Sequence, residues 1–147
     1  MNDFTIEHVL KSEYQTLVEV WEASVRATHH FLKEEDILYF RPLILNTYLD
    51  AVTLRCAKDN HGKILGFLGV ADHNLEMLFI QPDNRGMGIG SKMLDYAINE
   101  LEVQKVDVNE QNEEALGFYL KKGFEVVGRS ALDGSGKPYP ILHMKLN

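Results

Sequence analysis

The stretch IQPDNRGMGIGSKML, Ile80–Leu94, places three glycines at alternate positions directly before a run with helical periodicity. The glycines are Gly86, Gly88 and Gly90, and Pro82 ends the apolar segment before them. The first N–H groups of a helix lack internal partners and carry the positive end of the helix dipole. Glycines let a phosphate approach such a backbone closely. The stretch therefore predicts a binding site for a phosphate-bearing ligand.

Two common phosphate-binding motifs do not fit this stretch. A Walker A loop ends in Gly-Lys-Ser/Thr, whereas Gly90 is followed by Ser91 and then Lys92. The dinucleotide fingerprint requires a glycine at the position of Ser91, and it usually lies on the first strand of its domain. ATP and NAD are therefore disfavoured as ligands. On this stretch alone, a glycine turn without a ligand stays open as an alternative.

The rest of the sequence alternates between apolar strands and amphipathic helices. Strands are predicted at 4–10, 52–57, 64–71, 74–80, 106–108, 125–129 and 141–146, and helices at 12–25, 37–48, 93–101 and 112–122. Pro42 falls inside the second helix and predicts a kink or two short helices there. The loop at 131–140 is long for a hairpin and is a candidate functional segment. This order predicts one mixed α/β domain, residues 1–147, around a central sheet.

Composition and charge restrict the class of protein. The chain is 45% hydrophobic and 25% charged, which is typical of a soluble globular domain. It has neither an apolar stretch long enough to span a bilayer nor a signal-peptide pattern at its start. Its only cysteine is Cys56, so an internal disulfide is excluded. The net charge of −7 disfavours nucleic acid and is compatible with a cationic amine substrate. We expect a cytoplasmic protein without a membrane partner.

Two segments resemble the signatures of the GNAT superfamily of N-acetyltransferases. Arg85–Gly90 is similar to the acetyl-CoA signature Gln/Arg-x-x-Gly-x-Gly/Ala. Asn112–Phe124, NEEALGFYLKKGF, is similar to a later motif of the family, Asn-x-x-Ala-x-x-x-Tyr-x-x-x-Gly-Phe. The predicted element order also matches, so the resemblance covers nearly the whole chain and suggests a small bacterial member.

The resemblance implies a mostly antiparallel central sheet that splays after its fourth strand, with acetyl-CoA in the gap. Asn112 would lie beside the pantetheine or cap its own helix, and these alternatives stay open. The pantetheine would pair with the main chain of Leu78, Phe79 and Ile80, and the pyrophosphate would bind the N–H groups of Arg85, Gly86, Met87, Gly88, Ile89, Gly90 and Ser91.

The resemblance also implies direct transfer of an acetyl group to a primary amine of a small molecule or protein, in a ternary complex. A base must first remove a proton from the ammonium group, and the CoA thiolate then needs a proton donor. Tyr119 holds the family's tyrosine position and is the candidate general acid. Glu76 is the candidate base; by strand alternation it shares a face with Leu78, and His73 or ordered water are the alternatives. An N–H near Phe79 is the candidate oxyanion donor.

Candidates for the acceptor pocket come from the first helices and the last strands. They are His30, Phe31 and Tyr139, with His143 as a further residue near Tyr139. His29 and His30 are adjacent on a helix and do not face each other, so no metal site is expected. A homodimer is compatible with the resemblance. The alternative from another class of protein is an acyl-CoA-binding sensor without catalysis.

Overall fold

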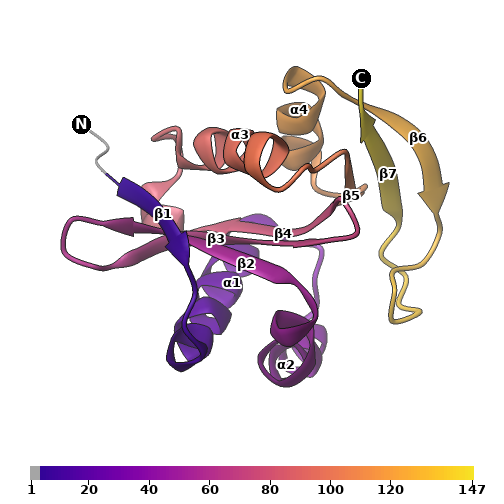
Figure 1. The fold of residues 1–147 in the computed structure, drawn as a ribbon. Coiled ribbons are helices and arrows are strands. Elements are labelled where there is room, and N and C mark those ends of the chain that lie inside the picture. Colours follow the sequence, from indigo (N-terminus) through magenta and orange to yellow (C-terminus); the bar gives the residue numbers. More distant parts are fainter. Residues whose placement is uncertain (1–3) are drawn as a thin grey trace.

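The computed structural model describes residues 4–147 as a seven-stranded sheet with helices on both faces (Figure 1). The order across the sheet is β1-β2-β3-β4-β5-β7-β6. The strands are β1 (Phe4–His8), β2 (Thr53–Asp59), β3 (Ile64–Ala71), β4 (Asn74–Ile80), β5 (Lys105–Asn109), β6 (Phe124–Ser130) and β7 (Ile141–Leu146). The α-helices are α1 (Tyr14–Thr28), α2 (Glu34–Leu43), α3 (Ile89–Glu100) and α4 (Glu113–Lys121). The predicted mixed α/β fold is confirmed.

The sheet opens between β4 and β5, as the resemblance implied. These two strands are parallel, and they pair only at Asn74–Lys105 and Leu75–Val106. All other pairs in the described sheet are antiparallel. Beyond Leu75, the edge of β4 that faces β5 has no strand partner among residues 4–147, so its N–H and C=O groups remain available to another extended chain.

A β-bulge in β4 changes the alternation expected there. Met77 pairs with Gly69 and Leu75 with Val70, so Glu76 is an extra residue in the strand. Consequently Leu75 and Leu78, three residues apart, both pack on the α3 side of the sheet. Simple alternation was therefore an incomplete guide to the direction of Glu76.

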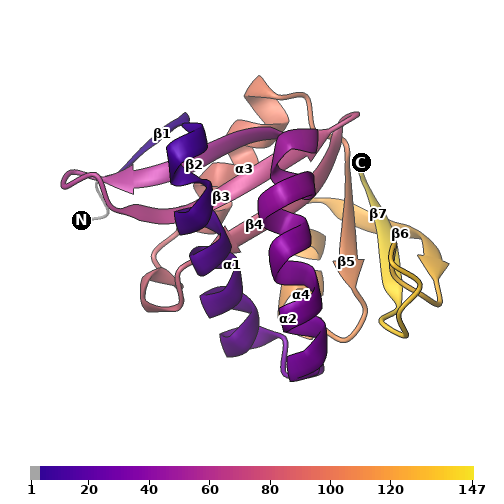
Figure 2. The ribbon, with the colours of Figure 1, turned by 90° about the horizontal axis from the view of Figure 1, so that it is seen from below.

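Two apolar cores lie on opposite faces of the sheet. Figure 2 shows the ribbon from the face of the sheet that α1 and α2 cover. Leu17, Trp21 and Val25 recur every four residues on α1 and are buried against the sheet. On the other face, α3 buries Met93 and Leu94. Within residues 4–147, no helix is long and apolar enough to cross a membrane.

The second helix passes through Pro42 instead of ending there. A π-helical turn, Ile44–Tyr48, follows α2 directly, and a 3₁₀ turn, Leu49–Ala51, leads into β2. Proline removes one N–H from the helical ladder and crowds the preceding turn. The predicted interruption therefore takes the form of a wider turn two residues after the proline.

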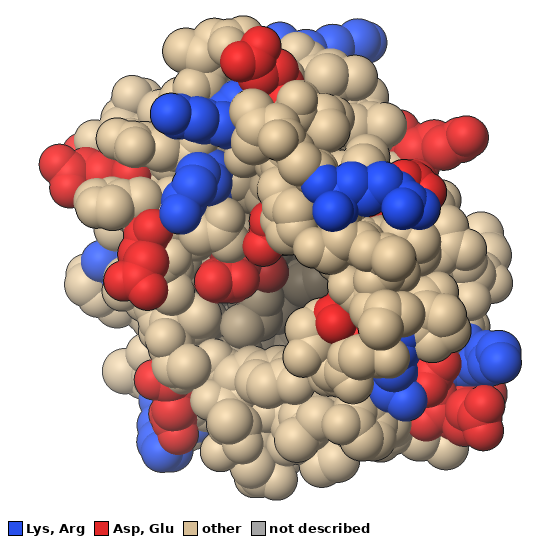
Figure 3. All heavy atoms as spheres, turned by 90° about the vertical axis from the view of Figure 1, so that its right-hand side faces the viewer, with Lys and Arg blue, Asp and Glu red and all other residues tan. Residues whose placement is uncertain are grey.

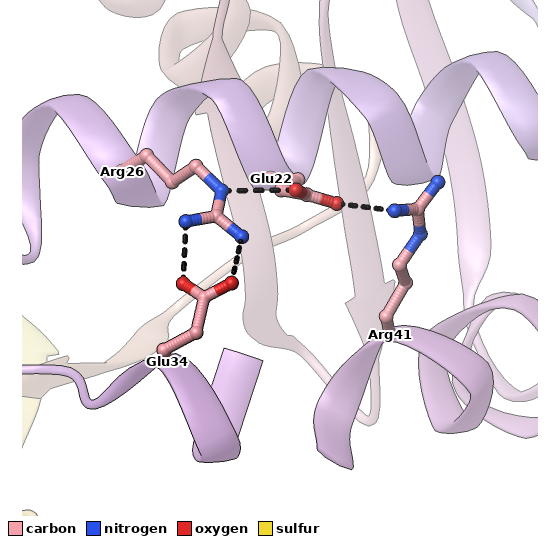
Figure 4. Close-up of polar contacts among 4 residues, drawn as sticks. All are labelled: Glu22, Arg26, Glu34 and Arg41. Atoms are coloured by element: carbon pink, nitrogen blue, oxygen red, sulfur yellow. Dashed lines mark hydrogen bonds and ion pairs between the residues drawn. The ribbon is translucent and has the colours of Figure 1, made fainter. Parts of the chain in front are cut away.

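An ion-pair network joins α2 to α1 (Figure 4). Arg26 pairs with Glu22 at 2.9 Å and with Glu34 at 2.6 Å, and Arg41 also pairs with Glu22, at 2.8 Å. Exposed pairs of this kind contribute about 1 kcal/mol or less each. These ion pairs connect α1 and α2 along their length, and both helices line the same cavity, which is described below.

Candidate active site

A cavity of about 420 Å³ occupies the opening of the sheet, and we call it the splay cleft. Its walls come from β4 and β5, from the turn before α3 and the start of that helix, and from α4. The unpaired edge of β4 at Leu78, Phe79 and Ile80 forms one side. The cleft therefore combines an open strand edge with a helix N-terminus.

The glycine turn lies at this helix N-terminus. Gly86 and Gly88 have φ angles of 80° and 81°, which L-residues rarely adopt, and Gly88 directly precedes α3. Gly90 has helical geometry, and a Cβ there would lie 3.9 Å from Ile80 and 4.0 Å from Phe118, both of which line the cleft. Arg85, Gly86, Gly88, Ile89, Gly90 and Ser91 line the cleft, whereas the exposed Met87 does not. The first two glycines are thus required by backbone conformation and the third keeps space in the cleft.

Polar groups around the turn fit a ligand that carries both negative charge and hydrogen-bond donors. Arg85 lines the cleft and pairs with Glu114. Lys122 donates to the Ser91 hydroxyl at 2.7 Å, which brings a second cation to the start of α3. The side-chain oxygen of Asn84, which also lines the cleft, is buried and has no hydrogen-bond partner among residues 4–147.

Asn112 caps its own helix, which is one of the two roles left open by the sequence, and it also lines the splay cleft. Its side-chain oxygen accepts a hydrogen bond from the Ala115 N–H at 3.1 Å and so caps α4. Its amide nitrogen lies 3.4 Å from Nε2 of His29, and the residue lines the splay cleft. The cap therefore also orients a polar group on the cleft wall.

Asn112→Ala should lower the free energy of unfolding by about 1 kcal/mol, because the first turn of α4 loses its cap. Asn112→Asp is the matched control, since a carboxylate accepts the same N–H. Urea unfolding followed by circular dichroism measures both variants. Equal stability of the alanine variant and the unchanged protein would show that the cap contributes nothing.

Tyr119 lies on α4 and belongs both to the apolar core and to the lining of the cleft. It is 7% exposed and lines the cleft, with Phe118 and Phe124 at 5.1 and 5.7 Å between ring centroids. Burial raises the pKa of its phenol, so the hydroxyl stays protonated at neutral pH. No group of the described chain hydrogen-bonds this hydroxyl. The site therefore presents a protonated donor with a free hydrogen-bonding position.

A second cavity, of about 550 Å³, adjoins the splay cleft on the α1 and α2 side; we call it the aromatic cavity. Its aromatic walls are Trp21, Phe40, Tyr48, Phe79 and Tyr139. The residues that line both cavities are His29, Glu76, Met77, Phe79 and Asn109, and they mark the junction. A molecule in one cavity can therefore meet a molecule in the other at these residues.

Glu76 lies at this junction. Glu76 is exposed to solvent, and partial desolvation of its carboxylate together with the nearby charge of Asp107 raises its pKa above the ordinary value for glutamate. His73, the other candidate base, is exposed on the β3–β4 turn, and its Nδ1 lies 3.1 Å from the carbonyl oxygen of Glu102. It lines neither cavity. The geometry therefore favours Glu76 over His73.

The three residues predicted to line the acceptor pocket, His30, Phe31 and Tyr139, lie at different distances from the aromatic cavity. Tyr139 is buried in the wall of the aromatic cavity and donates a hydrogen bond to Asp36. The ring of Phe31 lies behind the wall, 5.9 Å from the ring of Tyr139 and 5.2 Å from that of His29. His30 is exposed and lines neither cavity, so the structure does not bring it to this site.

His29 is the residue at the junction that sequence analysis missed. Thr28 donates its hydroxyl proton to the Ser24 carbonyl, so it accepts from Nδ1–H of His29 at 2.7 Å, and Nε2 is left as an acceptor. Burial, together with the charges of Arg85 and His30, lowers the pKa of His29 to about 4. A signal existed, because His29 continues the every-fourth-residue row of Trp21 and Val25 on the buried face of α1.

The mouth of the site is acidic. Figure 3 shows acidic side chains bordering a hollow on this side of the molecule. The carboxylates that line the two cavities are Glu76, Asp107, Glu114 and Asp133. Arg85 is the only lysine or arginine among the described residues that line them. The aromatic cavity, which has Glu76 and Asp133 and no lysine or arginine among its described lining residues, therefore favours cations.

Comparison with known proteins agrees with this geometry. Residues 51–126 match the family model described as an acetyltransferase (GNAT) domain. The peptidyl-lysine N-acetyltransferase YjaB of Escherichia coli (strain K12) is 39% identical over 132 residues, which cover 90% of this chain and 89% of the relative. The solution structure of apo-form YjaB from Escherichia coli has a TM-score of 0.90 at 37% identity and covers 98% of this chain and 97% of that chain.

A more distant structure shares the fold alone. It is the crystal structure of a PaiA N-acetyltransferase from Thermoplasma acidophilum in complex with coenzyme A. Its TM-score is 0.72 at 20% identity, over 99% of this chain and 100% of that chain. The splayed sheet, the glycine turn and the matching family model together indicate an acetyltransferase domain. The chain belongs to the GNAT family of N-acetyltransferases, as its two sequence motifs predicted.

Proposed function

We propose that the chain transfers the acetyl group of acetyl-CoA directly to a lysine ε-amino group of a protein or peptide. The observation that carries this proposal is the junction, where the splay cleft opens into an acidic cavity with aromatic walls. The names of the relatives, peptidyl-lysine N-acetyltransferases, support a protein amine as acceptor. A small-molecule amine is the alternative acceptor, and the experiment below separates the two.

The splay cleft would hold acetyl-CoA without a change of fold. The pyrophosphate would bind the N–H groups from Arg85 to Ser91, near the cations Arg85 and Lys122. The pantetheine would pair with the open edge of β4 at Leu78, Phe79 and Ile80. Asn112 and the unpaired oxygen of Asn84 would meet its amide groups from the other wall.

The acceptor would reach the thioester from the aromatic cavity. A lysine side chain has an apolar stem and a cationic tip, which suit the aromatic walls and the acidic junction. Glu76 would accept the proton that the ammonium group must lose before it attacks. A backbone N–H near Phe79 would stabilise the oxyanion, and Tyr119 would protonate the departing thiolate. As the intermediate collapses, the nitrogen would lose its second proton, which would restore the Tyr119 hydroxyl through water, so the amide and the thiol would both leave neutral.

The proposal is tested by calorimetry with acetyl-CoA, CoA, ATP and NAD, followed by turnover assays with a panel of lysine peptides and small amines. We expect binding of acetyl-CoA and CoA only, and acetyl transfer to peptide lysine. Turnover of small amines alone would overturn the choice of acceptor. Acetyl-CoA binding without turnover of any amine would instead favour the sensor.

The pH dependence of transfer should report Glu76. Because its pKa is raised, the carboxylate ionises at a higher pH than an ordinary glutamate, and the rate should rise as the pH increases through that raised value. Glu76→Gln should remove this step and lower kcat/KM by about 10²-fold. Glu35→Gln, on the exposed start of α2, is the matched control. An unchanged profile in the Glu76 variant would assign proton removal to ordered water.

A further inference from the structure

Three side chains on neighbouring strands form a continuous hydrogen-bonded row beside the splay cleft. The Ser130 hydroxyl on β6 lies 2.7 Å from Nε2 of His143 on β7. Nδ1 of the same imidazole lies 2.7 Å from a carboxylate oxygen of Asp107 on β5. Asp107 and His143 are direct partners in the sheet, which fixes their separation. The proposed acetyl transfer gives no role to Ser130 or His143.

The chemistry of the partners fixes the role of each group. A carboxylate only accepts hydrogen bonds, so Nδ1 of His143 carries the proton that Asp107 receives. Nε2 of the neutral ring is then an acceptor, and Ser130 must donate its hydroxyl proton to it. This is the proton arrangement of a Ser-His-Asp triad, which is recognised by geometry and roles and occurs on unrelated folds.

The surroundings of the row leave the serine accessible. Asp107 and His143 keep side-chain exposures of 42% and 41%, and Ser130 is half-buried. Gly128 lies opposite His143 in the sheet and leaves one edge of the ring uncovered, since a Cβ there would lie only 3.6 Å from Cδ2. β6 is an edge strand, so alternate backbone N–H groups along it have no strand partner in the described sheet. Such N–H groups are the donors that an oxyanion needs.

We propose that Ser130, His143 and Asp107 form a second reactive site, which hydrolyses small acyl esters and thioesters. The Ser130 oxygen attacks the acyl carbonyl carbon while His143 takes its proton. The bond to the alkoxide or thiolate leaving group breaks, and His143 gives that group the proton. Water then attacks the acyl-serine with His143 again as base, which releases the carboxylic acid and restores the serine. No oxidant, reductant or metal is required.

This activity differs from acetyl transfer in its nucleophile and in its place. Ser130 and His143 line neither the splay cleft nor the aromatic cavity. Asp107 lines the splay cleft, so it is not used as a neutral variant. The two activities can therefore be separated by substitution of Ser130.

The experiment measures hydrolysis of p-nitrophenyl acetate and of acetyl-CoA in the absence of amine, and labelling of Ser130 by a fluorophosphonate probe followed by peptide mass spectrometry. Ser130→Ala should abolish labelling and lower hydrolysis by about 10²-fold, while transfer to peptide lysine stays unchanged. His143→Gln should also lose labelling and is the second variant if the first fails to fold. Ser12→Ala, at an exposed serine before α1, is the control.

The possible outcomes distinguish ester from thioester donors, and they also test whether the site exists. Loss of p-nitrophenyl acetate hydrolysis alone in Ser130→Ala would assign the site to esters, and loss of both reactions would extend it to thioesters. Labelling and hydrolysis that persist in a folded Ser130→Ala variant, or an unchanged protein that is not labelled, would overturn the proposal. Tyr119→Phe should leave p-nitrophenyl acetate hydrolysis intact, because the proposed site does not use that residue.

Discussion

Tyr119→Phe is expected to lower kcat for amine acetylation by about 10²-fold and to leave the affinity for acetyl-CoA almost unchanged. The variant removes one hydroxyl from a residue that lines the splay cleft, and the walls that would hold the cofactor remain. Folding should also persist. No described group depends on that hydroxyl for a hydrogen bond, so its loss leaves no buried partner unsatisfied.

Steady-state kinetics with a lysine peptide measure the expected loss of kcat, and calorimetry with CoA measures the affinity. Tyr39→Phe is the matched control, because Tyr39 is 46% exposed on α2 and lines neither cavity. An unchanged kcat in Tyr119→Phe would show that solvent or another group protonates the thiolate. A loss of CoA affinity without a loss of kcat would make Tyr119 a binding residue instead.

Much of the fold could be predicted from local patterns. The boundaries of β3, β4 and β7 match the expected ranges, because each strand has a clear apolar pattern with turn residues at its ends. Gly123, just after α4, has a φ of 96°, as expected for a residue that ends a helix. The cap of α4 by Asn112 could likewise be predicted, because it depends only on residues within one turn.

Features that depend on the pairing of distant segments could not be predicted. The bulge at Glu76 exists because β4 pairs with β3 in one register, and no local signal in β4 announces it. Whether His29 or His30 lies at the junction of the two cavities depends on where α1 ends relative to Phe79 and Asn112. The row of Ser130, His143 and Asp107 requires three strands to lie side by side, although the residues are 13 and 36 positions apart in the chain.

The glycine turn shows how the two kinds of information combine. The spacing of the glycines predicts an anion site, and this prediction makes no distinction between the three glycines. In the structure they differ, because Gly86 and Gly88 have positive φ angles and Gly90 does not. A substitution at Gly88 therefore tests the backbone, whereas a substitution at Gly90 tests the space in the cleft.

Gly90→Val is accordingly expected to weaken binding of acetyl-CoA by at least about tenfold, which corresponds to about 1.4 kcal/mol, without unfolding the protein. The new Cβ would make only ordinary contacts with Ile80 and Phe118, but it would project between two walls of the cleft. Calorimetry gives the affinity and urea unfolding gives the stability. Gly117→Val, at a helical glycine with open space around it, is the matched control for the change in helix propensity.

Gly88→Ala should behave in the opposite way. Its φ of 81° forces an L-residue into the left-handed region, so the variant should lose about 1–2 kcal/mol of stability, although nothing lies within 4 Å of the added Cβ. If Gly90→Val bound acetyl-CoA normally in a folded state, the pyrophosphate could not lie on the first turn of α3. If both variants lost stability and kept affinity, the glycines would serve the conformation of the turn alone.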